Sequence, residues 1–364
     1  MSDRIRRFIC VIVPSTVCNL RCSYCYLQHR CDIKKPEFIK YKVSPEEFRR
    51  ALSQSRLGGV CMFNFTAEGE TLLQPGLIEY VRAVLDEGHY VEVVTNATIT
   101  KAFQEIADFP KSLLARLMLK CSFHYLELRE RRMLSTFFSN VRLVRDAGAS
   151  ITVELMPHDE LLPLREEIKA LTIREVGAPC HVTVGRDASE RDKLPLLTKL
   201  DRAEFKKAWS IFDSALFEYK LSVFEKQQKD FCYAGEWMMV LNMLTGDVKQ
   251  CYRGRVIFNA YKHIEAPLRF KAIGYCCPEP HCYNAHAWLT FGCIPSESAP
   301  YYDEVRDRHN CINGGGWLTP SVKSFFHQKF NENNKQYSEL RKKSILFSSF
   351  CYRIVRFVYR GLKG

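Results

Sequence analysis

Short apolar runs alternate with stretches of helical periodicity along the first two hundred residues. The apolar runs predict strands over residues 8–14, 60–65, 90–95, 115–123, 150–156 and 181–185. The stretches between them predict helices over 44–55, 76–88, 100–109, 132–147 and 163–173, and a long helical stretch follows at 201–227. Six strand–helix units favour a parallel sheet, either doubly wound or closed into a full or partial barrel.

Several helix ends carry their own sequence signals. Ser44 is placed to cap the first helix, with Glu47 three residues on, which is the pattern of a capping box. Gly88 and Gly148 stand where a helix ends before a strand, a position that favours a left-handed glycine. These signals support the same strand–helix alternation.

Polar side chains gather where the predicted strands end. Three cysteines follow the first strand, and further candidate residues follow or end the next four strands: Gly69, Glu70, Asn96, Ser122, His124 and Glu154. In parallel α/β folds the carboxyl ends of the strands share one edge, and active sites lie there. Five strand ends together therefore predict a site.

Composition indicates the class of protein and the cellular compartment to which this site belongs. The chain has 364 residues, 46% of them hydrophobic and 26% charged, as in ordinary soluble proteins. No stretch approaches about 18 uninterrupted apolar residues, and the N-terminal apolar run is too short for a signal peptide. A cytoplasmic location is the default expectation. In that reducing compartment, sixteen cysteines favour thiols or metal ligands over disulfides.

Cys18, Cys22 and Cys25 have the spacing C-x3-C-x2-C. Structural zinc commonly takes four ligands from paired C-x2-C units, so a zinc site would need Cys31 to complete the set. A c-type haem is excluded because Tyr26, not histidine, follows Cys25. The remaining alternative is an iron–sulfur cluster held by three thiolates.

This motif, with Tyr24 before its third cysteine and in the loop after the first strand, resembles the radical S-adenosylmethionine (radical SAM) superfamily. The resemblance covers residues of about 8–190. It implies a [4Fe–4S] cluster on Cys18, Cys22 and Cys25, whose open iron binds SAM. It also implies reductive cleavage to a 5′-deoxyadenosyl radical that abstracts a substrate hydrogen, and an electron donor such as flavodoxin or ferredoxin.

Other positions match the superfamily in part. Residues 68–71 occupy the place of its Gly-Gly-Glu-Pro motif; Gly69 and Glu70 match, whereas Glu68 and Thr71 depart from it. The resemblance makes Glu70 the candidate contact for the SAM amino group. It assigns ribose, carboxylate or substrate contacts to four polar residues, Asn96, Ser122, His124 and Glu154. Their structural alternatives are a turn residue for Asn96, a core hydroxyl for Ser122 and a buried ion pair for Glu154.

A second set of cysteines follows in residues 228–311. A hairpin with a Thr-Gly-Asp turn is predicted to return Cys251 towards Cys232. The spacing from Gly246 to Cys251 resembles the SPASM extension or its shorter Twitch relative, which bind auxiliary iron–sulfur clusters, although a C-x2-C unit is absent. The first-choice ligands are Cys232, Cys251, Cys277 and Cys282, with Cys276 or Cys293 in reserve. A structural zinc joined by His281 or His286 is the alternative.

The formal net charge of +12 is unevenly distributed. From Arg341 onwards the chain carries seven Lys and Arg and no acidic residue, interleaved with apolar side chains. This predicts a basic amphipathic helix that lies on an anionic membrane or packs on the domain. No nucleic-acid motif accompanies the charge. Residues 301–318 predict either an anion pocket, with Arg306 and Arg308 as its cations, or a solvated loop.

Together these features predict an α/β protein with a partial (β/α)6 TIM-like barrel at 1–227, a small cysteine-rich extension at 228–318 and a basic helical tail at 319–364. The predicted activity is that of a radical SAM oxidoreductase acting on a sugar, lipid-linked or polysaccharide precursor. The cluster motif starts at residue 18, leaving no room for an N-terminal peptide-recognition module. A peptide or protein maturase is the alternative, and so is a non-catalytic, zinc-stapled scaffold at a membrane surface.

Overall fold

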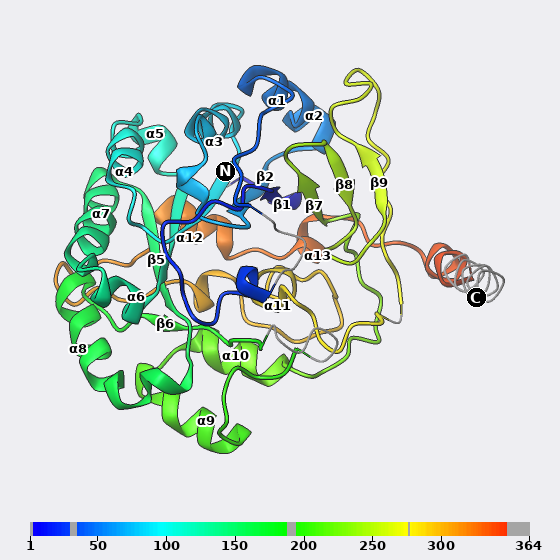
Figure 1. The fold of residues 1–364 in the computed structure, drawn as a ribbon. Coiled ribbons are helices and arrows are strands. Elements are labelled where there is room, and N and C mark those ends of the chain that lie inside the picture. Colours follow the sequence, from blue (N-terminus) through cyan, green and yellow to red (C-terminus); the bar gives the residue numbers. More distant parts are fainter. Residues whose placement is uncertain (1–2, 30–34, 188–193, 276, 348–364) are drawn as a thin grey trace.

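The computed structural model describes residues 3–29, 35–187, 194–275 and 277–347 (Figure 1). Its centre is one sheet with the strand order β6-β5-β4-β3-β2-β1-β7-β8-β9. The first six strands are parallel and lie in chain order: β1 (Arg7–Val13), β2 (Cys61–Ala67), β3 (Tyr90–Thr95), β4 (Leu117–Phe123), β5 (Ser150–Leu155) and β6 (His181–Val182). This sequential order is consistent with the predicted open partial barrel.

Helices connect the strands at the predicted places. Their bounds are α1 (Pro45–Ala51), α2 (Gln54–Leu57), α3 (Leu77–Asp86), α4 (Thr100–Ala107), α5 (Lys111–Leu114), α6 (Tyr125–Glu130), α7 (Leu134–Ala147) and α8 (Arg165–Val176). The capping box of Ser44 and Glu47 is confirmed, and Gly148 ends α7 in the left-handed conformation.

The prediction of one long helical stretch over 201–227 is wrong, because the stretch is interrupted. It divides into α9 (Arg202–Trp209) and α10 (Ala215–Val223), with the 3-10 turn η4 (Ser210–Phe212) between them. Asp213 has a φ of 46° there, and Ser214 caps α10 by accepting a hydrogen bond from the Phe217 amide. A left-handed residue ends a helix, so the chain turns at this point.

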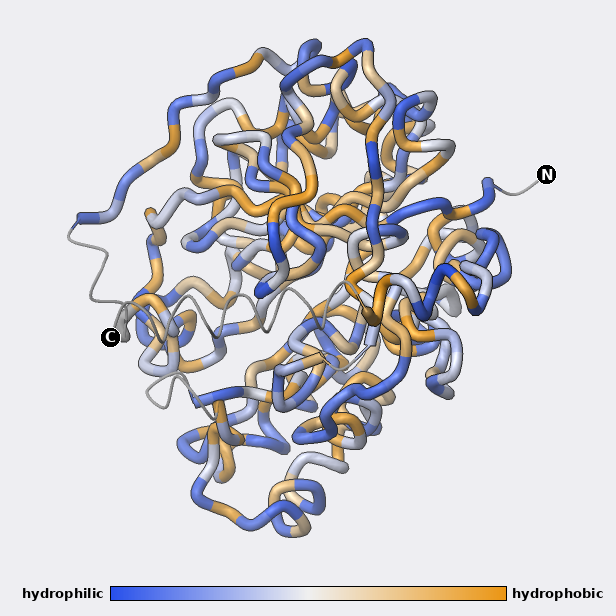
Figure 2. Tube along the Cα trace, turned by 90° about the vertical axis from the view of Figure 1, so that its right-hand side faces the viewer, coloured by the Kyte–Doolittle hydropathy of each residue, from blue (hydrophilic) through white to orange (hydrophobic). Residues whose placement is uncertain are grey.

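The two faces of the sheet belong to different cores. Outward side chains such as Phe63 and Val93 pack in the core that includes residues of the surrounding helices. Inward side chains such as Met62 and Met118 pack instead on the C-terminal third of the chain, including Phe291. Because strand residues alternate between faces, the concave face is filled by the C-terminal region. Figure 2 shows hydrophobic segments concentrated in the middle of the molecule.

The cysteine-rich region also extends the sheet. β7 (Met238–Asn242) pairs in parallel with β1, and the predicted hairpin is confirmed by antiparallel pairing of β7 with β8 (Asp247–Lys249). β9 (Val256–Asn259) completes this edge, and α11 (Ala285–Trp288), α12 (Pro320–Phe326) and α13 (Phe330–Asn333) follow. The remaining 3-10 helices are η1 (Tyr26–His29), η2 (Thr71–Leu73), η3 (Asp159–Leu164) and η5 (Asp303–Val305).

The tail is only partly described. α12 packs on the barrel, where the Phe325 ring stacks on that of Tyr90 with centroids 3.7 Å apart. Residues 348–364 of the basic segment lie outside the described residues, as do Cys31 and Cys276. Over the ranges that the structure describes, no helix is both long and apolar enough to cross a membrane. The bounds of the three predicted domains stay a prediction.

Candidate functional site

Hydrogen bonds fasten the loop that carries the three cysteines to neighbouring strand ends. The Asn19 side chain donates to Thr98 at 2.8 Å and accepts from Asn96 at 2.8 Å, so it joins the loop to the end of β3. The Arg21 amide donates to the Glu127 carboxylate on α6 at 2.7 Å. These contacts fix the loop after β1 against the strand ends of β3 and β4.

One cavity of about 270 Å³ lies beneath this loop. Cys18, Cys22 and Cys25 all line it. Six of the seven residues assigned to cofactor contacts line the same cavity: Tyr24, Gly69, Glu70, Asn96, Ser122 and His124. The topology therefore brings residues from four strand ends to a single place, as expected for a parallel sheet.

Glu70 is held rigidly at the edge of this cavity. Its carboxylate accepts hydrogen bonds from the amides of Leu72, at 3.0 Å, and Asn96, at 2.7 Å, and from the Thr95 hydroxyl. Burial raises the pKa of Glu70, while these donors oppose that shift. A carboxylate with three protein donors keeps limited capacity for a ligand amine, so it is a fixed and preorganised acceptor.

Gly69 has no room for a side chain. A Cβ atom at this position would lie 2.2 Å from the carbonyl oxygen of Val17. The Gly69 amide donates to Ser15 at 2.8 Å, and the Glu70 amide donates to Val17 at 2.8 Å. The loop after β2 is thereby pressed against the residues that lead into the cysteine motif, and only glycine permits this approach.

Tyr24 and His124 connect the cysteine motif to β4. The Tyr24 hydroxyl lies 2.6 Å from Nδ1 of His124, and its ring packs on that of His158 at 4.9 Å between centroids. Burial lowers the pKa of His124 to about 4 and raises that of Tyr24, so both side chains are neutral at neutral pH. Burial also raises the pKa of Cys22 to about 12.

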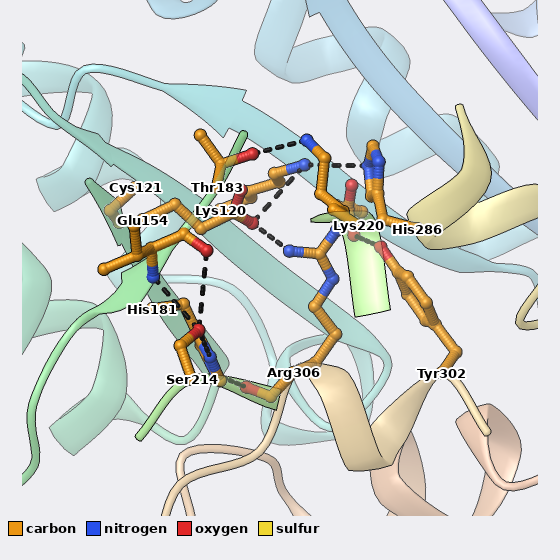
Figure 3. A network of polar contacts seen from close by, with 12 residues as sticks. Lys120, Cys121, Glu154, His181, Thr183, Ser214, Lys220, His286, Tyr302 and Arg306 are labelled. Atoms are coloured by element: carbon orange, nitrogen blue, oxygen red, sulfur yellow. Dashed lines mark hydrogen bonds and ion pairs between the residues drawn. The ribbon is translucent and has the colours of Figure 1, made fainter. Parts of the chain in front are cut away.

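Glu154 does not line the cavity. Its carboxylate instead pairs with the fully buried Arg306 guanidinium and lies 3.4 Å from Nζ of Lys120 (Figure 3). Burial would raise the pKa of Glu154, but Arg306 and Lys120 outweigh it and lower the pKa to about 2. The structure thus places Glu154 in the buried ion pair that was its structural alternative.

The solvated loop favoured by the sequence for residues 301–318 is wrong at Arg306, whose side chain is 0% exposed. Trp317 is also buried and donates a hydrogen bond from its indole to the Val176 carbonyl at 3.0 Å. Aromatic residues in the segment, among them Tyr302, pack on the inner core and carry Arg306 inward.

The second cysteine set converges on another cavity. Its walls include all four first-choice ligands and one of the two reserve residues: Cys232, Cys251, Cys277, Cys282 and Cys293. The Cys232 and Cys293 sulfur atoms lie 3.7 Å apart. His281 lines this cavity too, whereas His286 lies at a different one. Among the residues with described positions, no three Cys, His, Asp or Glu side chains are arranged to hold a single metal ion.

The sequence reasoning missed a polar layer inside the barrel. Glu92 on β3, Lys120 on β4 and His286 on α11 line a cavity on the concave face. A signal was present, because "YVEVVT" and "LMLKCSF" each carry one charged residue in the middle of an apolar strand. A charge at such a position costs free energy unless it is paired or serves a ligand.

Comparison with known proteins identifies an N-terminal part of the chain. Residues 12–161 match the family model of the radical SAM superfamily. A curated relative, the 7-carboxy-7-deazaguanine synthase of Thermoplasma acidophilum, is 31% identical over 90 residues, which is 25% of this chain and 38% of that protein. The chain thus spans well under half the length of this relative.

Solved structures resemble the chain more distantly. Streptococcus suis SuiB bound to S-adenosylmethionine has a TM-score of 0.48 at 13% identity, over 72% of this chain and 63% of SuiB. The anSMEcpe structure with bound AdoMet has a TM-score of 0.47 at 13% identity, over 71% of this chain and 78% of that one.

The superfamily match implies a [4Fe–4S] cluster and SAM as cofactors. The residues present fit both groups. Three cysteines within eight residues line one cavity, and thiolates are the ligands of such clusters. Fixed polar groups from Glu70 and Asn96 share its walls, as an amino acid ligand requires.

Proposed function

Residues 12–161 of the chain form a radical SAM domain, and from this premise we propose that the protein is a radical SAM oxidoreductase with an auxiliary iron–sulfur cluster. The observation that carries the proposal is the single cavity shared by Cys18, Cys22 and Cys25 and by polar residues of three further strand ends. A scaffold held together by zinc would not need polar residues from several strand ends around its metal site.

In this proposal Cys18, Cys22 and Cys25 hold a [4Fe–4S] cluster. When bound and reduced, it supplies the electron that cleaves SAM and releases a 5′-deoxyadenosyl radical. The remaining steps belong to the protein. Glu70 accepts from the SAM amino group while Thr95 and the Leu72 amide keep its carboxylate in place. Asn96, Ser122 and His124 orient the rest of SAM and exclude water from the cavity.

The five cysteines of the second cavity support an auxiliary cluster. Four thiolates complete the ligand set of an iron–sulfur cluster, and the described residues offer five. Cys293 thereby moves from a reserve position to a candidate ligand, since its sulfur lies beside that of Cys232. A fully ligated cluster would accept an electron from the substrate, which favours net oxidation.

Iron content tests the auxiliary cluster. Anaerobically reconstituted protein is expected to hold about eight iron atoms per chain, and Cys22→Ala or a Cys251→Ala/Cys282→Ala double variant about four. Cys311→Ala is the matched control, because Cys311 is exposed and lines neither cavity. Zinc in place of iron at the second set would contradict the auxiliary cluster.

The reaction is tested by product formation. Reconstituted protein given dithionite and SAM is expected to release 5′-deoxyadenosine, and Cys22→Ala is expected to release none. Cys311→Ala should match the wild type. Protein that holds zinc instead of iron and leaves SAM intact would contradict the proposed enzyme activity and favour the scaffold.

The substrate class of a sugar, lipid-linked or polysaccharide precursor rests on the basic amphipathic composition from Arg341 onwards. Residues 348–364 lie outside the described part, so membrane association stays a prediction. Sedimentation with anionic liposomes, for the full chain and for a truncation at Arg341, tests it. Equal partitioning of the two proteins would contradict it.

A further inference from the structure

We propose that the cavity inside the barrel binds an anionic group of the substrate, a carboxylate or a phosphate, through Lys120 and His286 of its wall, with Lys220 nearby but outside the lining. This inference rests on the proposed function and deepens it, because it names the chemistry by which a substrate is recognised. It is carried by the position of the cavity, by the basic side chains around it and by the kind of hydrogen-bonding atoms left unpaired near it.

The cavity adjoins the cofactor site. It measures about 140 Å³ and is lined by Asn64, Glu92 and Lys120 from the strands and by Asn284 and His286 from the C-terminal region. Thr66 and Val94 line both this cavity and the one beneath the cysteine loop. A molecule bound here would therefore lie next to the SAM site, where a substrate has to be.

Along the strands, the side chains on the inner face of the barrel change from apolar to polar. Met62, Tyr90 and Met118 form an apolar layer with the inner core. Two residues further along the same strands come Asn64, Glu92 and Lys120, all on the same face because strand residues alternate. A polar layer above an apolar layer, at the depth of a cavity, is the arrangement of a ligand site.

The cluster around the cavity contains three basic and two acidic side chains. Lys120 and Glu92 line the cavity, and Glu154, Lys220 and Arg306 lie around it outside its lining. Arg306 and Lys120 both lie within ion-pair distance of Glu154. Glu92 instead accepts hydrogen bonds from two neutral donors, Asn64 and Tyr302. An anionic ligand would favour the protonated form of Lys220 and supply a further counter-charge to the buried bases.

Lys220 carries the clearest imbalance. Among the described residues its contact is the Thr183 hydroxyl, and no carboxylate lies within ion-pair distance of its ammonium group. Burial, followed by the charges of Arg186 and Lys120, lowers the pKa of Lys220 well below its ordinary value. An anion beside it would reverse that shift, so binding would be coupled to proton uptake.

The hydrogen-bonding atoms that lack a partner within the described ranges indicate that the ligand is an anion. Nε2 of His286 lies 3.4 Å from Nζ of Lys120, which can only donate, so Nε2 accepts and Nδ1 carries the proton. That Nδ1 has no hydrogen-bond partner in the described part of the chain, and neither do Nε and Nη2 of Arg306. All three atoms are donors. Anionic oxygens are the complementary acceptors.

Isothermal titration of the full-length reconstituted protein, without SAM or dithionite, tests the site with two probes, inorganic phosphate and malonate. At least one probe is expected to bind with a stoichiometry of one. Lys120→Met, Lys220→Met and His286→Leu should each weaken that binding at least tenfold. Lys207→Met is the matched control, because Lys207 is exposed on α9, and it should bind as the wild type does.

The two probes distinguish the sources of the anion. Saturable binding of phosphate indicates a phosphorylated substrate, and binding of malonate alone indicates a carboxylated one. Absence of binding by both probes, or binding that the three variants leave unchanged, would overturn the proposal. So would a tenfold loss of SAM affinity in Lys120→Met without a change in probe binding, because the cavity would then belong to the cofactor. Failure of SAM cleavage, measured separately, would overturn the proposed function instead.

Discussion

The Tyr24 hydroxyl lies 2.6 Å from Nδ1 of His124 and so ties the cysteine loop to the end of β4. The two residues are one hundred positions apart in sequence, and both line the cavity that also contains Cys18, Cys22 and Cys25. The contact makes the cysteine loop part of the barrel wall.

Tyr24→Phe removes this hydrogen bond and retains the ring. We expect the free energy of unfolding to fall by about 1 kcal/mol, the usual contribution of such a bond, and SAM affinity to fall by a similar free energy. Urea unfolding and equilibrium titration with SAM measure the two effects. Tyr301→Phe is the control, because the Tyr301 hydroxyl donates to the exposed Glu332, away from the cavity. Unchanged SAM affinity in Tyr24→Phe would contradict the role given to this contact.

Gly69→Ala tests the close approach between the loop after β2 and the entry to the cysteine motif. The added Cβ would meet the Val17 carbonyl oxygen at 2.2 Å, so the backbone has to move. We expect a loss of about 1–3 kcal/mol in stability, typical of overpacking, together with weakened SAM binding. Gly315→Ala is the control, since its Cβ would make only an ordinary contact at 3.4 Å. Equal effects of the two changes would count against a packed loop.

Glu154→Gln leaves the buried Arg306 without its counter-charge. The expected cost is about 3–5 kcal/mol in the free energy of unfolding, measured by urea denaturation. A Glu154→Leu/Arg306→Met double variant should be less destabilised than the single one, because it removes both charges. Glu46→Gln, in the exposed pair with Arg49, should cost far less, because solvent screens that pair. A small loss for Glu154→Gln would show that Arg306 finds another partner.

Acid is expected to destabilise the protein as the pH falls from 6.5 towards 4. Burial lowers the pKa values of His89 and His124 to about 4, so below pH 6.5 the unfolded chain binds protons that the folded one does not. Each histidine contributes up to about 1.4 kcal/mol per pH unit in that window, and its contribution is constant above it. Unfolding at several pH values measures the slope.

His89→Gln should flatten this slope, because glutamine can keep the contacts of His89 to the Cys61 amide and the Leu52 carbonyl without titrating. His309→Gln, at an exposed position, should leave the slope as it is. A stability that does not change between pH 6.5 and 4 would contradict the burial of these imidazoles.

The sequence predicted the strands well because each carries a local apolar pattern that suffices to identify it. β3 has the predicted bounds, Tyr90–Thr95, and the polar residues at the strand ends meet because parallel strands share an edge. What failed depended on distant partners. Nothing near Arg306 in the sequence indicates that a loop will carry it 152 positions back to Glu154. Similarly, Lys120 and Glu92 acquire a role only when the C-terminal region covers the concave face.

Cys18, Cys22 and Cys25 are proposed to hold a redox-active cluster that binds SAM. Electron paramagnetic resonance of the dithionite-reduced Cys251→Ala/Cys282→Ala variant tests it directly, because the proposed auxiliary cluster is then removed and no substrate is needed. We expect a [4Fe–4S] signal whose spectrum changes when SAM is added, and no such signal once Cys22→Ala is introduced as well. A signal that SAM leaves unchanged, or one that persists without Cys22, would contradict the account.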